Sequence, residues 1–206
     1  MAANDAHYFA ASPDVASDPR EVELPLPDLT LRFHTDTGVF ARDAVDAGTR
    51  ILLSEGGGAA SSGILVDLGC GYGPIAVALG RRSPAAQVWA IDPNERAREL
   101  CRRNADRNGA ANVVVMAPDA VPAGPIDELW SNPPVRIGKP AMRRLVSEWL
   151  ERLSPTGRAV LVIQKHLGAD SFAAWLNESG YPTTRLCARQ AYRILEVRPR
   201  EATAID

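Results

Sequence analysis

Two stretches of the 206-residue chain have the residue types and spacing needed to hold a ligand. The first is Ile64-Leu-Val-Asp-Leu-Gly-Cys-Gly-Tyr-Gly-Pro74. Its apolar start has no helical period, which predicts a buried strand with Asp67 near its end. The glycines that follow at alternate positions let the backbone turn sharply beside a ligand, and Pro74 suits the first position of a helix. The stretch therefore predicts the strand, turn and helix of a nucleotide-type site.

The glycine spacing and two acids indicate which nucleotide would bind. The order is G-x-G-x-G, whereas the dinucleotide fingerprint is G-x-G-x-x-G. A carboxylate at Asp67 would repel a pyrophosphate but attract the ammonium and sulfonium groups of S-adenosylmethionine. Asp92 ends the next apolar run, about 20 residues after the glycine loop. An acid in this place can accept hydrogen bonds from both ribose hydroxyls of a bound nucleotide. We therefore expect S-adenosylmethionine, and a dehydrogenase is the least favoured alternative.

The second stretch is Asn132-Pro133-Pro134, directly after the apolar run at 126–130. Adjacent prolines fix an extended backbone and remove two N–H donors, so the Asn132 oxygen and backbone carbonyls form a notch of acceptors. Such a notch would accept both hydrogens of a planar –NH2 group and point the nitrogen lone pair at a methyl donor. This chemistry depends on positioning and electrostatic preorganisation, so it requires no strong base.

Strands that alternate with helices would position these residues. We predict strands that end near 67, 91, 116, 130 and 163, with helices between them and a final antiparallel pair at 183–188 and 192–197. We expect the strand at 112–116 to be buried, Asn94 to cap the helix after the second strand, and a later helix to begin at Met142. This rhythm indicates an α/β fold with a mostly parallel seven-stranded sheet, right-handed crossovers and helices on both faces. Ligands bind at the carboxyl ends of such strands, where four polar residues fall: Asp67, Asp92, Asp119 and Asn132.

Composition excludes several other classes. The net charge of −2 argues against bulk electrostatic binding of nucleic acid, although a local basic face is compatible with it. Three widely spaced cysteines without a C-x-x-C pair indicate neither a disulfide framework nor a zinc site, and they fit a reducing cytoplasm. No run approaches the roughly 18 to 20 apolar residues that cross a bilayer. We expect a cytoplasmic protein that needs neither metal nor membrane.

The N-terminal part alternates apolar and polar residues at 21–26 and 29–34 around Pro27-Asp28, which predicts a β-hairpin. A loop rich in glycine, threonine and aspartate follows, and Thr49 is a candidate helix cap before the apolar Ile51-Leu-Leu53. We expect a small N-terminal extension.

These motifs resemble a known family. The glycine loop and Asp92 are similar to motifs I and II of the class I S-adenosylmethionine-dependent methyltransferases, with their Rossmann-like fold. The segment Thr35–Leu53 resembles the one before the cofactor loop in the methyltransferase small domain family. Asn132-Pro-Pro-Val135, its continuation to Lys139, and Gln164–Asp170 resemble the RsmC-type 16S rRNA guanine-N2 methyltransferases of that family. The resemblance covers the chain from about Arg32 to Val197. It does not include the additional N-terminal domain of the longer RsmC-type enzymes, which leaves the RNA target open.

The resemblance implies domains and cofactor contacts. Residues 1–60 would be an N-terminal extension of hairpin and short helix packed on the core, and 61–206 the methyltransferase domain, together one structural domain. Asp119 would receive the exocyclic amine of adenine. The expected cofactor-binding residues are Asp67, Gly69, Cys70, Gly71, Gly73, Pro74, Asp92, Pro93, Asp119, Ala120 and Asn132, and the product would be S-adenosylhomocysteine.

The resemblance also implies a class of methyl acceptor. The (N/D)-P-P motif marks methyltransferases that act on adenine N6, guanine N2 or a glutamine amide, and the expected catalytic residues are Asn132, Pro133 and Pro134. Many members have an aromatic residue after the prolines, so Val135 disfavours adenine N6. The two lysines of the chain lie in predicted loops at this face and suit phosphates. The expected substrate-binding residues are Phe40, Val135, Arg136, Lys139, Lys165 and His166.

We therefore expect a methyltransferase that modifies guanine N2 in structured RNA, namely ribosomal RNA or a ribosomal subunit, as a monomer or weak homodimer. A protein glutamine or adenine N6 is the alternative acceptor, and the basic residues argue mildly against glutamine. A non-catalytic cofactor-binding regulatory subunit is a third hypothesis. The intact Asn132-Pro-Pro sequence argues against it, since such a protein has no chemical reason to keep the notch.

Overall fold

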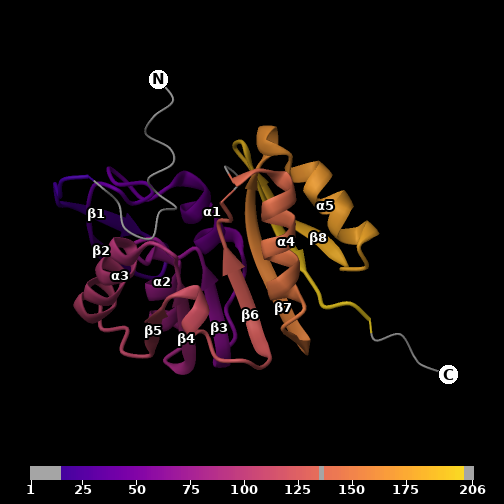
Figure 1. Ribbon diagram of the computed structural model, residues 1–206, viewed down its shortest axis with the longest axis horizontal. Helices are drawn as coiled ribbons and strands as arrows, with labels where there is room; N and C mark the ends of the chain where they lie inside the picture. Colours follow the sequence, from indigo (N-terminus) through magenta and orange to yellow (C-terminus); the bar gives the residue numbers. More distant parts are fainter. Residues whose placement is uncertain (1–14, 135–136, 202–206) are drawn as a thin grey trace.

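The computed structural model describes residues 15–134 and 137–201, and Figure 1 shows their arrangement. Two predicted substrate residues, Val135 and Arg136, lie outside the described residues. The chain forms three layers, in which helices cover both faces of a central sheet. None of the helices in the described parts is long and apolar enough to span a membrane.

The sheet has seven strands in the order β5-β4-β3-β6-β7-β9-β8, and only β9 runs antiparallel to its two neighbours. The mostly parallel seven-stranded sheet is therefore confirmed. The strands are β3 (Ser62–Leu68), β4 (Ala85–Ile91), β5 (Val113–Met116), β6 (Ile126–Ser131), β7 (Leu153–Gln164), β8 (Thr183–Arg189) and β9 (Tyr192–Val197). The strand order reverses between β3 and β6, so the glycine loop and Asn132 lie on either side of the switch point where such sheets bind ligands.

Two hydrophobic clusters hold helices against the sheet. One face carries α1 (Ala47–Glu55), α2 (Pro74–Arg82) and α3 (Glu95–Arg107); the other carries α4 (Lys139–Leu150) and α5 (Ala169–Glu178). Helix α2 begins at Pro74 as predicted. The predicted cap of α3 is also confirmed, because the Asn94 side chain accepts a hydrogen bond from Ala97 N at 3.2 Å. Single turns of 3-10 helix follow β5 and β7, namely η2 (Pro118–Ala120) and η4 (Lys165–Leu167).

The predicted hairpin is present as β1 (Arg20–Pro25) and β2 (Thr30–Thr35), which lie beside α3 at one end of the molecule (Figure 1). Two asparagines, one in α3 and one at its C-cap, hold β2 by pairing with its backbone. Asn104 is fully buried; it accepts from His34 N at 2.7 Å and donates to His34 O at 2.9 Å and to Tyr72 O at 2.8 Å. Asn108 pairs with Arg32 in the same way. The hairpin is thereby connected through α3 to the glycine loop.

The structure corrects three local predictions. The N-cap of α1 is Asp46, whose carboxylate accepts from Thr49 N, so Thr49 lies in the first turn. Strand β5 was expected to be buried, but it is an edge strand with Val114 exposed. Helix α4 begins at Lys139 rather than Met142, because Pro140 in its first turn needs no hydrogen-bond partner.

Candidate functional site

The glycine loop after β3 is fixed on one side and open on the other. Gly69 N and Cys70 N both donate to Ile91 O, at 2.8 and 3.0 Å, which ties the loop to the end of β4. A Cβ on Gly73 would lie 2.7 Å from Cys101 Sγ, so helix α3 closes that side. A Cβ on Gly69 or Gly71 would meet no described atom within 4 Å. These two glycines therefore leave open space above the loop, where a ligand can approach the backbone.

Asp92 holds the glycine loop from the end of β4. Its carboxylate accepts from Gly71 N at 2.9 Å through Oδ2 and from Asn94 N at 2.8 Å through Oδ1. Burial raises the pKa of this carboxyl above its ordinary value, and the two backbone N–H groups oppose that shift. Each carboxylate oxygen can accept a second hydrogen bond, so the group is suited to ribose hydroxyls as well as to the loop.

Asp67 lies beneath the loop and is fully buried. Its Oδ2 accepts from Ala76 N at 2.9 Å in the first turn of α2, where the preceding Gly73 offers no side-chain cap. Among the residues that the structure describes, none donates a hydrogen bond to Asp67 Oδ1. Burial raises the pKa of Asp67 to about 8, helped by the nearby Asp92 charge. A positive charge near this buried carboxyl, such as the ammonium of S-adenosylmethionine, would favour its ionised form.

One pocket brings the two sequence motifs together. Its cavity is small, about 40 Å³. A ligand larger than this cavity would extend over the open side of the glycine loop. The lining residues are Phe40, Ala41, Asp46, Thr49, Gly69, Cys70, Gly71, Tyr72, Pro74, Ile75 and Asn132.

Asn132 projects from the end of β6 into this pocket with its amide group held. Its Nδ2 donates to Asp46 Oδ2 at 2.9 Å and to Thr49 Oγ1 at 3.1 Å. With both amide hydrogens bound, the oxygen Oδ1 is the atom available to accept from a ligand. Pro133 is buried and Pro134 is half-buried. Sequence reasoning did not assign a functional role to Asp46 or Thr49, although the segment that contains them was part of the family resemblance.

Phe40 is presented to the pocket by a well-anchored loop. Its side chain is 51% exposed, while the neighbouring Val39 is buried. Side chains around the loop donate to its backbone carbonyls: Arg96 to Thr37 O, Asn94 to Gly38 O, Tyr72 to Ala41 O and Thr35 to Arg42 O. Ala41 has a φ of 56°, an uncommon value for a residue other than glycine. The loop therefore holds an exposed aromatic ring at the rim in a defined place.

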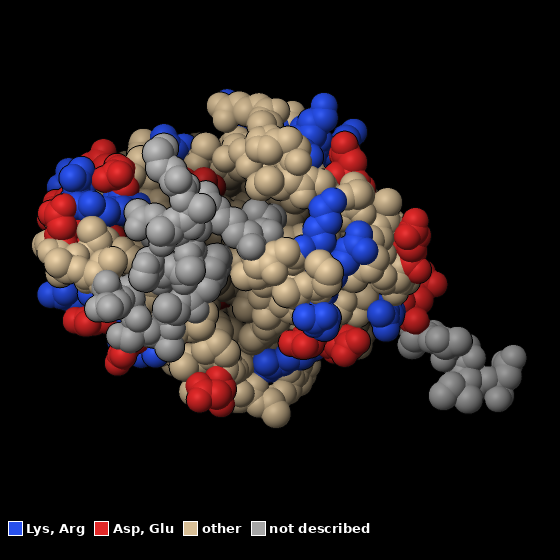
Figure 2. Space-filling model, turned by 45° about the horizontal axis from the view of Figure 1, so that its top comes forward, with Lys and Arg blue, Asp and Glu red and all other residues tan. Residues whose placement is uncertain are grey.

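Several of the predicted site residues that the structure describes do not line this pocket, namely Asp67, Gly73, Asp92, Pro93, Asp119, Ala120, Pro133, Pro134, Lys139, Lys165 and His166. Asp119 and Ala120 are exposed in η2, and Pro93 is exposed beside Asp92. Lys165 and His166 are exposed in η4, which follows β7. Lys139 is near them, because its Nζ lies 3.5 Å from the position of a Cβ on Gly168. Figure 2 shows Lys and Arg interspersed with Asp and Glu on the face turned forward.

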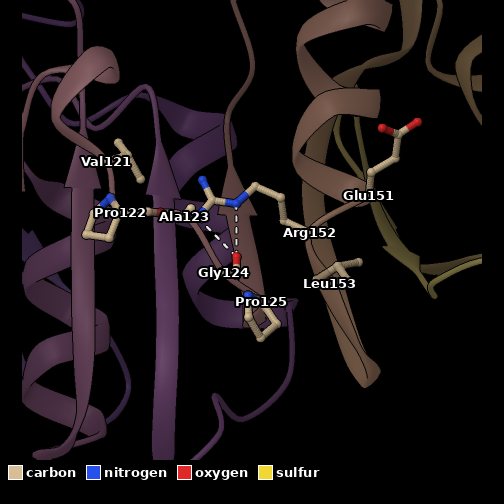
Figure 3. Close-up of a pocket in the computed structure, with 8 residues that line it drawn as sticks. All are labelled: Val121, Pro122, Ala123, Gly124, Pro125, Glu151, Arg152 and Leu153. Carbon is tan, nitrogen blue, oxygen red and sulfur yellow. Dashed lines mark hydrogen bonds between the residues drawn. The ribbon is translucent and has the colours of Figure 1, made fainter.

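A larger pocket, of about 550 Å³, lies at the opposite end of the sheet (Figure 3). It is lined by residues 121–125, before β6, and by residues 151–153, at the start of β7. Arg152 donates there to Pro122 O at 2.6 Å and to Gly124 O at 3.2 Å. Its guanidinium also lies over the Trp149 ring at 4.7 Å. Arg152 thus connects the loop before β6 to the start of β7.

Comparisons with known proteins agree with this geometry. The sequence pattern of the family described as "Methyltransferase small domain" matches residues 30–196. Uncharacterized protein YbxB of Bacillus subtilis is 32% identical over 93% of this chain and 98% of its own length. Ribosomal RNA small subunit methyltransferase C of Pseudomonas aeruginosa is 33% identical, and the match covers 77% of this chain and 52% of that protein. The chain thus spans about half the length of this ribosomal RNA methyltransferase.

A solved structure shows the same fold. The T. thermophilus 16S rRNA N2 methyltransferase RsmC, in complex with AdoMet and guanosine, superposes with a TM-score of 0.76 at 22% identity, and the match covers 91% of this chain and 52% of that one. The fold is of the class I, Rossmann-like type, and the family match and its relatives show an S-adenosylmethionine-dependent methyltransferase. Within that class, the chain belongs to the methyltransferase small domain family.

Proposed function

We propose that this protein transfers a methyl group from S-adenosylmethionine to the exocyclic N2 of a guanine in structured RNA, most directly ribosomal RNA. The observation that carries the proposal is the shared pocket, in which Asn132 faces the open side of the glycine loop with its Oδ1 available. The family relatives named as ribosomal RNA methyltransferases support the choice of acceptor.

The proposed cofactor contacts follow from the strand ends. Asp67 would face the ammonium end of the cofactor, Asp92 the ribose hydroxyls, and Asp119 the adenine amine. Gly69 and Gly71 would let the cofactor approach the backbone closely, since a Cβ there meets open space. Bound in this place, S-adenosylmethionine supplies an electrophilic methyl group and leaves as S-adenosylhomocysteine. The methyl group would face the cavity beside Asn132.

The acceptor base would enter from the rim. A guanine in structured RNA must be extruded from its stack, which costs a few kcal/mol. Phe40 offers an aromatic face for the extruded base, and the exposed Lys139 and Lys165 would bind neighbouring phosphates.

At the reacting atoms, Asn132 Oδ1 and the carbonyl of Pro133 would accept the two N2 hydrogens. This turns the nitrogen lone pair out of conjugation and toward the methyl carbon. The nitrogen lone pair would form the new N–C bond while the S–C bond of the methyl donor breaks with its electrons on sulfur, and the extra proton on nitrogen would leave to water. The protein's contribution is positioning and electrostatics.

A test begins with ribosomal subunits and RNA from a strain deleted for this protein. Purified protein and labelled S-adenosylmethionine are added to each substrate, and the RNA is digested for nucleoside mass analysis. The proposal predicts N2-methylguanosine in one of the ribosomal RNAs. N6-methyladenosine, or label only in protein, would reassign the acceptor; no transfer despite measured cofactor binding would refute the catalytic proposal.

A further inference from the structure

The side-chain amide of Asn132 is oriented by the N-terminal end of α1. Asp46 Oδ2 accepts one hydrogen bond from Asn132 Nδ2 at 2.9 Å, and Thr49 Oγ1 accepts the other at 3.1 Å. An isolated amide can rotate by 180° and exchange its oxygen and nitrogen with little preference. A carboxylate only accepts hydrogen bonds, so the Asn132 –NH2 group must face Asp46. The oxygen Oδ1 then faces away from Asp46.

The orienting group is itself held in place. Asp46 is the N-cap of α1, and the same Oδ2 accepts from Thr49 N at 3.1 Å. Behind it, a Cβ on Gly48 would lie 2.7 Å from Tyr192 Cε1, so the start of α1 is in close contact with the first residue of β9. Thr49 is buried with a relative exposure of 6%. The Asp46 carboxylate therefore has a defined position before any substrate arrives.

We propose that Asp46 is a positioning residue of the methyl-acceptor site, with Thr49 as the second acceptor for the Asn132 amide. Because both amide hydrogens are bound, Asn132 Oδ1 is reserved for the –NH2 group of the acceptor. With the amide reversed, the Asn132 –NH2 group would face the –NH2 group of the acceptor. Two donors cannot form a hydrogen bond, so the acceptor would not bind productively. The charge of Asp46 also polarises the amide and makes Oδ1 a stronger acceptor. The catalytic part of this inference rests on the proposed function, whereas the orientation of the amide does not.

The competing explanation is that Asp46 only caps α1. The variant Asp46→Ser separates the two roles, because serine is as good a helix cap as aspartate but is shorter and uncharged. Asp43→Ser is the matched control, because Asp43 is an exposed acid of the same segment that pairs with Arg20 at 3.1 Å. Thermal unfolding of both variants then measures any loss of structure.

The first measurement does not require activity. The side-chain amide signal of Asn132 is identified by NMR through its disappearance in Asn132→Ala, and its exchange with solvent is followed. We expect exchange to become at least about tenfold faster in Asp46→Ser, since a charge-assisted hydrogen bond is removed, and to stay unchanged in Asp43→Ser. Unchanged exchange in Asp46→Ser would overturn the inference. If the wild-type protein methylates no RNA but the exchange of its Asn132 amide still depends on Asp46, the proposed acceptor is wrong, whereas the inferred orientation of the amide is retained.

The second measurement is methyl transfer. We expect Asp46→Ser to lower kcat on the order of 10- to 100-fold, the effect of removing a hydrogen bond to a charged group, without changing the KM for S-adenosylmethionine. Asp43→Ser should transfer methyl groups like the wild type. A decrease in kcat matched by Asp43→Ser, or one accompanied by lower thermal stability and a higher KM for S-adenosylmethionine, would show that Asp46 acts only on the structure of α1.

Discussion

The carboxylate of Asp92 and the backbone of Gly71 are directly bonded, with Oδ2 2.9 Å from the Gly71 nitrogen. The residue proposed for the cofactor ribose thus also sets the shape of the loop below the cofactor. Since one side chain serves both purposes, Asp92→Ala should weaken S-adenosylmethionine binding on the order of 100-fold or more, as expected when two hydrogen bonds to a charged group are removed. Calorimetric titration measures this, and Asp106→Ala, an exposed acid on α3, should bind like the wild type.

Gly71 and Gly73 should respond differently to substitution by alanine, although both have positive φ, 54° and 98°. Gly71→Ala adds a Cβ to open space, so its stability should fall by only about 1–2 kcal/mol from the left-handed backbone. The added methyl would nevertheless stand where the cofactor is proposed to lie. Gly73→Ala should lose about 1–3 kcal/mol more, because its Cβ would overlap Cys101 Sγ. Denaturant unfolding with cofactor titration distinguishes them, and normal binding by Gly71→Ala would contradict the proposed cofactor position.

Asp67 should make the stability of the ligand-free protein dependent on pH. Its pKa is about 8 in the folded protein, against an ordinary value of 3.8. The folded state therefore holds the proton more tightly, and the stabilisation present below pH 4 is lost as pH rises to 8. The slope from this one group is at most about −1.4 kcal/mol per pH unit. Asp67→Asn should make the free energy of unfolding less dependent on pH between pH 4 and 8, whereas Asp106→Asn should leave this dependence unchanged. The same slope in wild type and Asp67→Asn would contradict the assignment.

Lys139 and Lys165 should contribute to RNA affinity through phosphates. Both are exposed at the carboxyl-end side of the sheet. Replacing either by alanine should reduce the slope of log affinity against log salt by about 0.7 to 0.9 for each phosphate that is no longer neutralised. Filter binding of ribosomal RNA over a range of salt gives this slope. Arg103→Ala, an exposed cation of α3 paired with Glu99, is the control and should leave it unchanged. If all variants give the same slope of log affinity against log salt, the RNA phosphates do not contact Lys139 or Lys165.

Much of the fold follows from local sequence signals. Pro74 and Asn94 mark the starts of α2 and α3 because each satisfies a local requirement of a helix N-terminus. The alternating residues of the hairpin are equally local. Strand β5 was misjudged because its apolar residues give the same pattern in a central strand and in an edge strand. Its exposure is decided by its place in the sheet order.

The individual polar residues of the site could be predicted from the sequence, but the hydrogen bonds between them could not. Polar residues at strand ends are visible in the sequence, since parallel strands end at one edge. The hydrogen bond between Asp46 and Asn132 joins residues 86 positions apart, and no local pattern predicts it. The absence of a hydrogen-bond partner for Asp67 Oδ1 among the described residues likewise depends on how α2 packs over β3.

The central claim is that Asn132 holds the methyl acceptor rather than the methyl donor, although the family resemblance also places it among the expected cofactor-binding residues. Asn132→Ala tests it most directly, with single-turnover methyl transfer to ribosomal RNA and S-adenosylmethionine affinity measured on the same preparation. We predict that transfer is abolished while cofactor affinity stays within about twofold of wild type, because the deleted oxygen binds only the acceptor. Full turnover in Asn132→Ala, or a loss of cofactor binding large enough to explain the missing transfer, would contradict the assigned role.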